Sequence, residues 1–217
     1  MRLVTLGVGA ADSPRYRPAG LLVSCRGTRV IIDGGPHAVP KGRVDAWLLT
    51  DDHAELAAAI RRSARALGLT ARVASFRAGG LRIEPKPVVH TNHPTFAYEL
   101  RGGGLKVVWA PEFFEFPSWA KHADLMFAEA SSWNRPICFR GAVGGHLDAR
   151  SVERAARQAG VKRLVFAHIG RPTMRAIEGG ARPSFGELAR DGQIFLQRVR
   201  PKSRPRARRS WRARGAR

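Results

Sequence analysis

Short apolar segments separated by turn residues recur through the first 197 residues, and this spacing constrains the fold more than any other feature. Runs of roughly four to eight apolar or β-branched residues bounded by Gly, Pro, Asn or Asp are typical of strands. Strands are therefore expected at 2–7, 20–33, 44–49, 71–76, 81–85, 87–90, 96–111, 124–130, 161–169 and 192–199. The segments 20–33 and 96–111 each contain a glycine turn, which predicts a hairpin.

Two helices are expected, at 54–67 and 148–159. In the first, Leu56, Ile60, Ala64 and Leu67 recur on one face, and Gly160 follows the second. Strands outnumber helices early and strand–helix pairs follow, so the layout is mixed α/β. The length of 217 residues suits one core. Residues 198–217 are rich in Pro and Arg and are expected to be disordered, which places the folded domain at 1–197.

The chain is strongly basic, with 38 Lys or Arg against 17 Asp or Glu and a net charge of +21. Ten of the basic residues lie in 198–217, where there is no acid, so +11 remains on the body. One interpretation is an affinity for polyanions through neutralisation of phosphates. The other is a solvated basic surface and tail with no specific partner. The composition does not decide between them.

Cysteine usage and the N-terminus predict a cytoplasmic protein without a membrane span. Cys25 and Cys138 are too few for a disulfide framework or a thiolate zinc cluster. The segment MRLVTLGVGA contains no apolar run long enough for a signal peptide or a transmembrane helix.

Acids and histidines stand at or just after the ends of five predicted strands, and one more histidine precedes a helix. They are Asp33, the loop Asp51-Asp52-His53-Ala54-Glu55, His90, Glu112 and His168, with His146 before the second helix. Strand ends on one edge of a sheet converge in space, so these side chains are expected to share a pocket. Imidazole and carboxylate are ligands that zinc, manganese and iron accept.

Each of these residues also has a structural interpretation. Asp52 and Glu55 have the spacing of a capping box, in which the Asp caps the helix amides and the Glu reaches back. His90 and His168 could each satisfy a buried turn. The loop 51–55 is therefore either part of a metal site or the cap of the following helix.

Five segments in order resemble the metallo-β-lactamase fold superfamily, in its ribonuclease Z and cyclic phosphodiesterase branch. They are MRLVTLGVGAADSP, SCRGTRVIIDGGP, LLTDDHAEL, VVHTNHPTFAYELRGGGLKVVWAPE and GGHLDARSVERAARQAGVKRLVFAHI. The resemblance implies an α/β protein folded as an αββα sandwich. Fewer residues than the family usually has separate Leu56 from His90, so a compact variant is expected.

The resemblance also implies a metal site, in altered form. The family's THxHxDH loop aligns with Thr50, Asp51, His53, Glu55 and Leu56, so only Thr50 and His53 keep the family's residue type. The later ligand positions hold His90, Glu112 and His168, with His93 as a competitor of His90. Asp51, His53, His90 and Glu112 remain for the first metal position, and Glu55, Glu112 and His168 for the second. One divalent ion (zinc, manganese or iron), or none, is expected.

By the same resemblance His146, after Gly145, helps to protonate a leaving group, and Asp33 supports the site without ligating. The first functional hypothesis is a metal-dependent hydrolase that acts on a phosphodiester or another anionic ester, of small-molecule or nucleic-acid origin, through a metal-activated water. The second is a non-catalytic protein that binds nucleic acid through its basic surface and tail. The third is a relative whose pocket serves packing only.

The second hypothesis predicts that truncation after Val199 removes most of the affinity for nucleic acid, because the arginine-rich segment supplies the phosphate contacts. Fluorescence anisotropy with a labelled oligonucleotide, measured across salt concentrations, checks this. Equal affinity of truncated and full-length chains would show that the tail is not the contact.

Overall fold

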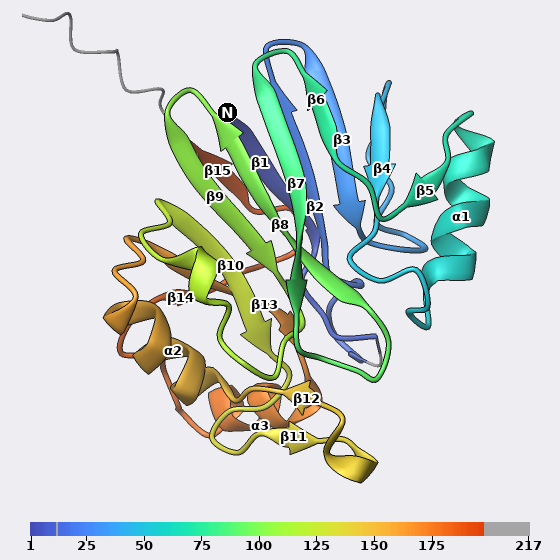
Figure 1. The fold of residues 1–217 in the computed structure, drawn as a ribbon. Coiled ribbons are helices and arrows are strands. Elements are labelled where there is room, and N and C mark those ends of the chain that lie inside the picture. Colours follow the sequence, from blue (N-terminus) through green and yellow to red (C-terminus); the bar gives the residue numbers. More distant parts are fainter. Residues whose placement is uncertain (12, 198–217) are drawn as a thin grey trace, which may run out of the picture.

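The computed structural model describes residues 1–11 and 13–197; the expected disordered tail, 198–217, lies outside the described residues. Two β-sheets lie face to face, with helices at the outer faces and at one end (Figure 1). The first sheet has the order β15 (Ile194–Leu196), β1 (Arg2–Gly7), β2 (Gly20–Cys25), β3 (Thr28–Asp33), β4 (Ala46–Leu48), β5 (Ala71–Arg72). The second has the order β14 (Glu187–Leu188), β13 (Leu164–Ile169), β10 (Leu125–Ala130), β9 (Leu105–Ala110), β8 (Thr95–Gly102), β7 (Leu81–Val88), β6 (Phe76–Ala78).

Helices and a small hairpin complete the fold. The helices are α1 (Ala57–Ala66), α2 (Ala149–Gln158) and α3 (Arg171–Glu178), with 3-10 turns η1 (Ser118–Ala120) and η2 (Arg140–Ala142). β11 (Ile137–Cys138) pairs antiparallel with β12 (Gly145–His146). This hairpin projects from the end of the sandwich at which α3 lies (Figure 1). Among the described residues, no helix is both long and apolar enough to span a bilayer.

Side chains of the first sheet alternate between two apolar clusters. Leu21 and Val23 of β2 belong to the main core between the sheets, which also contains Ile83 and Leu100 of the second sheet. Leu22, between them, packs outward in the cluster that includes Ile60 and Ala64 of α1. This alternation follows from the two-residue period of a strand. It explains why almost every residue of these strands is apolar.

α2 covers the outer face of the second sheet. Val152 and Ala156 are fully buried and belong to the same core cluster as residues of β10 and β13. The helix begins after Asp148, whose Oδ1 accepts a hydrogen bond from the Ser151 backbone N–H at 3.0 Å. With α1 outside one sheet and α2 outside the other, the expected αββα sandwich of the α/β class is confirmed.

The capping interpretation of the loop 51–55 is wrong. α1 begins at Ala57, three residues later than expected, and no side chain caps its first turn. Asp52 instead forms an ion pair with Arg61 at 2.7 Å. The apolar stripe is also shorter than expected, because Leu67 is exposed whereas Ile60 and Ala64 are buried. The helix is held by its alanine face and Ile60 rather than by a cap.

The expected strands 81–85 and 87–90 form one strand, β7, which runs through Pro85 and Pro87. β8 pairs with β7 along its whole length, from Leu81 to Val88. On the other side β6 reaches only as far as Ile83. Both prolines therefore lie beyond the end of β6, where no neighbouring strand needs their missing N–H groups. The two expected strands are therefore a single strand, which accommodates both prolines.

The capping assignments predict unequal effects of two aspartate substitutions on stability. Asp148→Ala removes a cap and should lower the free energy of unfolding by about 1–2 kcal/mol. Asp52→Ala removes only a half-exposed ion pair and should cost about 0.5 kcal/mol or less. Urea denaturation followed by circular dichroism measures both. Equal losses would contradict the assignment of Asp148 as a cap and Asp52 as none.

Candidate functional site

A single pocket gathers the polar residues at the strand ends. Its volume is about 820 Å³, a size suited to a small-molecule site. All eight site residues expected from the sequence line it: Asp33, Asp51, His53, Glu55, His90, Glu112, His146 and His168. The convergence of strand ends that the sequence implied is therefore present, although the residues fall into distinct groups.

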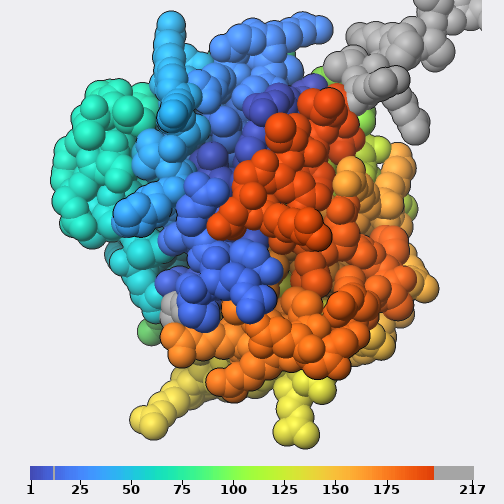
Figure 2. Space-filling view, turned by 180° about the vertical axis from the view of Figure 1, so that it is seen from behind, coloured from blue at the N-terminus to red at the C-terminus, as the bar shows by residue number. Residues whose placement is uncertain are grey.

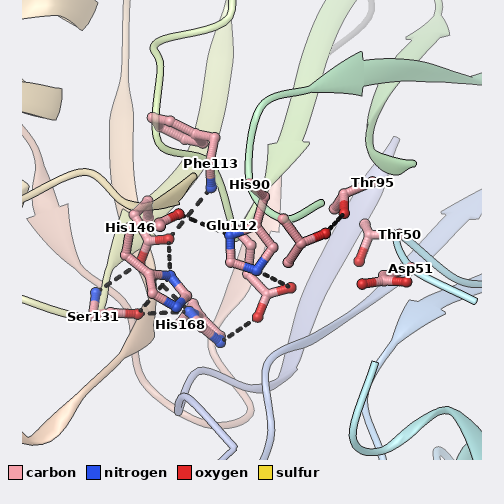
Figure 3. Close-up of polar contacts among 12 residues, drawn as sticks. Thr50, Asp51, His90, Thr95, Glu112, Phe113, Ser131, His146 and His168 are labelled. Atoms are coloured by element: carbon pink, nitrogen blue, oxygen red, sulfur yellow. Dashed lines mark hydrogen bonds and ion pairs between the residues drawn. The ribbon is translucent and has the colours of Figure 1, made fainter. Parts of the chain in front are cut away.

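The floor of the pocket is built around the Glu112 carboxylate, which His168 of β13 and His90 from the loop after β7 both face. His168 Nε2 lies 3.0 Å from Glu112 Oε1, and His90 Nε2 lies 3.9 Å from Glu112 Oε2 (Figure 3). Both histidines are buried, and Glu112 is mostly so. The opposite nitrogen of His90, Nδ1, donates to the Gly145 carbonyl of β12 at 2.8 Å. That contact fixes the orientation of the His90 ring and leaves Nε2 as its lone-pair donor.

Glu129, which the sequence reasoning missed, forms the layer behind this floor. It is fully buried in β10, and its Oε1 accepts the Ser131 backbone N–H at 2.7 Å. Its Oε2 lies 2.7 Å from His146 Nδ1. Ser131 Oγ lies 2.9 Å from His168 Nδ1 (Figure 3). The signal in the sequence was a single acid inside the otherwise apolar strand LMFAEA, since a buried carboxylate requires partners.

Charge and burial shift three pKa values in opposite directions. Burial alone would lower the pKa of His168, but the charge of Glu112 and hydrogen bonds with Glu112 and Glu129 raise it to about 10. Burial would likewise raise the pKa of Glu112, yet His168 and His90 lower it to about 2. Burial would also raise the pKa of Glu129, but His146 and His168 hold that pKa well below its usual range. Without a metal, the floor is thus a set of ion pairs with His168 protonated.

Asp33 lies at the junction of the two sheets, and each oxygen of its carboxylate has a donor. Thr50 donates to Oδ1 from its backbone N–H at 2.7 Å and from Oγ1 at 2.9 Å. Trp109 Nε1 of β9 donates to Oδ2 at 2.7 Å. Desolvation raises the pKa of Asp33 to about 6 against the effect of these donors, so the carboxylate is ionised at neutral pH. These contacts hold Asp33 at the end of β3, where the two sheets meet.

The loop 51–55 belongs to a separate group on one side of the floor. Asp51 is buried, and its Oδ2 lies 2.8 Å from His93 Nε2 while its Oδ1 accepts the His53 backbone N–H. The His53 ring lies edge-on to His93, with ring centroids 5.1 Å apart. Figure 3 shows Asp51 to one side of the group around Glu112. His93 thus pairs with Asp51 and does not replace His90, and Glu55 stands exposed at the rim.

Two site residues have left-handed backbone conformations. Asp33 has φ 54° and His168 has φ 55°, at or next to the end of β3 and β13 respectively. A residue with a Cβ reaches this region at a cost of roughly 1–2 kcal/mol. The surrounding hydrogen bonds hold both residues there, and the turn aims each side chain inward. Strain of this kind clusters at functional sites.

The donor set of the floor fits a divalent cation. Two imidazole nitrogens and a carboxylate face one another, and the other nitrogen of each imidazole already has a fixed partner, as metal-binding histidines require. Among the described residues, ligand atoms of Glu129, His146 and His168 also lie within 4.8 Å of one another. The 2.7 Å contact of His146 with Glu129 has the length of a charge-assisted hydrogen bond.

Comparison with known proteins identifies the fold. No family model matches the sequence, and neither does any curated protein. Among solved structures, the metallo-beta-lactamase fold protein YhfI from Bacillus subtilis matches with a TM-score of 0.67 and 16% identity, over 90% of this chain and 99% of that chain. A diphosphatase from the PhnP family matches with a TM-score of 0.71 and 17% identity, over 90% and 97%. The short form of human tRNase Z matches with a TM-score of 0.67 and 15% identity, over 90% and 99%.

These matches span nearly the whole of each compared chain at low sequence identity, so they define the architecture. The chain has the metallo-β-lactamase fold, as its sequence motifs indicated.

The raised pKa of His168 predicts how the stability of metal-free protein changes with pH. The folded state keeps a proton that the unfolded state releases above about pH 6.5, so this stabilisation is complete below 6.5 and is lost as pH rises through about 10. At the acid end, the contribution of Glu112 is present above about pH 4.5 and is lost as pH falls through about 2. The loss on the alkaline side can reach about 1.4 kcal/mol per pH unit.

Urea denaturation of chelator-treated protein between pH 6 and 10 measures this loss. His168→Gln cannot take up the proton, so its curve should fall less steeply than that of the wild type. Parallel curves for the two proteins would contradict the ion pair between Glu112 and His168.

Proposed function

We propose that the pocket is the active site of a metal-dependent hydrolase that acts on a phosphodiester or another anionic ester. The observation that carries the proposal is the convergence of His90 Nε2, Glu112 and His168 Nε2 from three segments of the chain. Each imidazole has its second nitrogen fixed by a backbone carbonyl or by Ser131. Such a preset donor group has no purpose in packing alone.

His90, Glu112 and His168 would hold one divalent ion, and zinc, manganese and iron all accept two imidazoles with a carboxylate. A bound ion of this kind lowers the pKa of a water molecule and polarises a phosphoryl or acyl oxygen. Asp51, which the resemblance assigns to the first metal position, already has His93 on Oδ2 and a backbone amide on Oδ1. This pairing supports one ion rather than two.

His146 would serve as the general acid. Its Nδ1 is held by Glu129 Oε2 at 2.7 Å, an arrangement that fixes the ring and its tautomer. The His146 ring stacks on His168 with centroids 5.5 Å apart and lies edge-on to His90 at 4.7 Å. It therefore stands beside the proposed metal position, where a proton for a leaving oxygen is needed. Phe139 packs against both His90 and His146 and shields this side of the floor from water.

Two kinds of observation support an anionic substrate. The chain is basic even without residues 198–217. Its fold neighbours include, by name, a diphosphatase and a tRNase Z, although neither name transfers a substrate at such low identity. The alternative of a non-catalytic nucleic-acid binder depends mainly on the tail, which lies outside the described residues.

Measured metal content distinguishes two ligand assignments. In one the metal is held at the floor around Glu112, and in the other, given by the family resemblance, His53 is also a ligand. His90→Ala should reduce bound metal from about one ion per chain to nearly none, because it removes a buried ligand. His53→Ala should leave the metal content close to wild type, since His53 lies in the separate group with Asp51 and His93. Elemental analysis of untagged proteins purified without chelator gives both values.

Hydrolysis of bis(p-nitrophenyl) phosphate is measured on the same samples. His146→Ala should retain the metal and lose activity by about 10²–10⁴-fold, the usual contribution of a general acid. Absence of metal from the wild-type protein, even after incubation with excess zinc or manganese, would exclude the hydrolase.

A further inference from the structure

The helix α3, which the sequence reasoning did not anticipate, forms part of the pocket rim. Gly170, Arg171, Pro172 and Arg175 all line the pocket. Arg171 and Arg175 are four residues apart on one helix, so their side chains lie on the same face, one turn apart. Both arginines therefore border the pocket above its floor.

Contacts on both sides fix the orientation of this helix. Thr173 and Met174 are buried, and Met174 Sδ accepts a hydrogen bond from Ser13 Oγ at 3.6 Å. Arg15 forms an ion pair with Glu178 at 2.6 Å. Figure 2 shows the segment before β2 (blue) lying against α3 (orange). With Thr173 and Met174 turned inward, the Arg175 side chain is kept on the pocket side.

Arg175 is exposed, and within residues 1–11 and 13–197 its side chain has no ion pair or hydrogen bond. The acid nearest to it along the helix, Glu178, is engaged by Arg15. Other arginines are paired, for example Arg61 with Asp52 and Arg163 with Glu187. The five N–H donors of Arg175 thus remain available at the rim, in a geometry suited to a phosphate.

The floor of the pocket and its α3 side contain side chains of opposite charge. The floor contains Glu112, with Glu129 behind it and Asp33 beneath it, and these carboxylates suit a cation. At the rim, the α3 side contains the guanidinium group of Arg175, which suits an anion, whereas the exposed carboxylate of Glu55 stands elsewhere on the rim, at the loop 51–55. One anionic group of a substrate would be drawn to the cation at the floor. A substrate with a second anionic group would in addition reach the rim, where a guanidinium and a phosphate form strong charge-assisted hydrogen bonds.

We propose that Arg175 binds a second phosphate of the substrate, remote from the ester that is hydrolysed. This inference rests on the proposed hydrolase site, since that site defines which phosphate is the first. The preferred substrates are then phosphoesters with at least two phosphate groups, and simple monoanionic esters bind less well. Arg175 selects the substrate and takes no part in bond cleavage.

The test compares two ligands that differ only in the second phosphate, adenosine 3′,5′-bisphosphate and adenosine 5′-monophosphate. Calorimetric titration of the metal-containing wild-type protein should give about tenfold tighter binding of the bisphosphate, the gain expected from one charge-assisted contact. Arg175→Gln should lose most of this preference. Arg65→Gln, a matched control, removes the same charge from an exposed position on α1 outside the pocket and should keep the preference.

An unchanged preference in Arg175→Gln, or an equal loss in Arg65→Gln, would overturn the inference. Hydrolysis of bis(p-nitrophenyl) phosphate by the wild-type protein is measured separately. This assay distinguishes failure of the phosphate-subsite proposal from failure of the hydrolase proposal. A preference that depends on Arg175 in a protein without hydrolytic activity would support the phosphate subsite and reject the hydrolase. Hydrolysis without a preference for the bisphosphate would support the hydrolase and reject the phosphate subsite.

Discussion

The Asp33 carboxylate joins the two sheets at the end where the pocket opens, and the site depends on that junction. Asp33 ends β3, whereas its donors come from Thr50 after β4 and from Trp109 on β9 of the opposite sheet. Two further bonds cross the same gap, from Tyr98 Oη to the Leu49 carbonyl and from the Phe96 N–H to the Thr50 carbonyl. Burying an ionised carboxylate is costly unless donors surround it. The donors that meet this cost are therefore also the ones that hold the two walls of the pocket together.

The mixed α/β layout and the pocket were predictable from the sequence because both depend on strand periodicity, whereas the αββα sandwich was implied by the family resemblance. Hairpins such as 20–33 have local glycine turns, and the acids and histidines follow apolar runs, so their convergence needs only the sheet edge. Errors arose where tertiary contacts decide. Asp52 and Glu55 have the spacing of a helix cap, yet Asp52 forms an ion pair with Arg61, and the neighbouring Asp51 pairs with His93, 42 residues away. Glu129 was missed because a single acid in an apolar strand shows its partners only after folding, and α3 because RPTMRAIE is short.

The histidines and acids of the pocket form two groups with different contacts. Around Glu112 the imidazoles are oriented as ligands, each fixed from behind by Gly145 or Ser131. Around Asp51 a carboxylate and an imidazole instead contact each other directly, since Asp51 pairs with His93. Asp51 and Leu56 stand where the resemblance to the family would place histidines. A carboxylate at position 51 attracts a nearby imidazole, and Leu56 offers no lone pair to a second ion.

The two prolines of β7 have a consequence for association between molecules. Past Ile83, within residues 1–11 and 13–197, this strand has no neighbouring strand on its outer side, so it forms an edge of the second sheet. Pro85 and Pro87 lack N–H groups, and the Pro87 carbonyl already accepts a hydrogen bond from Trp119 Nε1 at 3.2 Å, so this stretch of edge offers few free donors and acceptors. A strand from another copy could not complete a hydrogen-bonded ladder there. The chain thus carries, beside its pocket, a built-in obstacle to sheet extension and to the aggregation that begins with it.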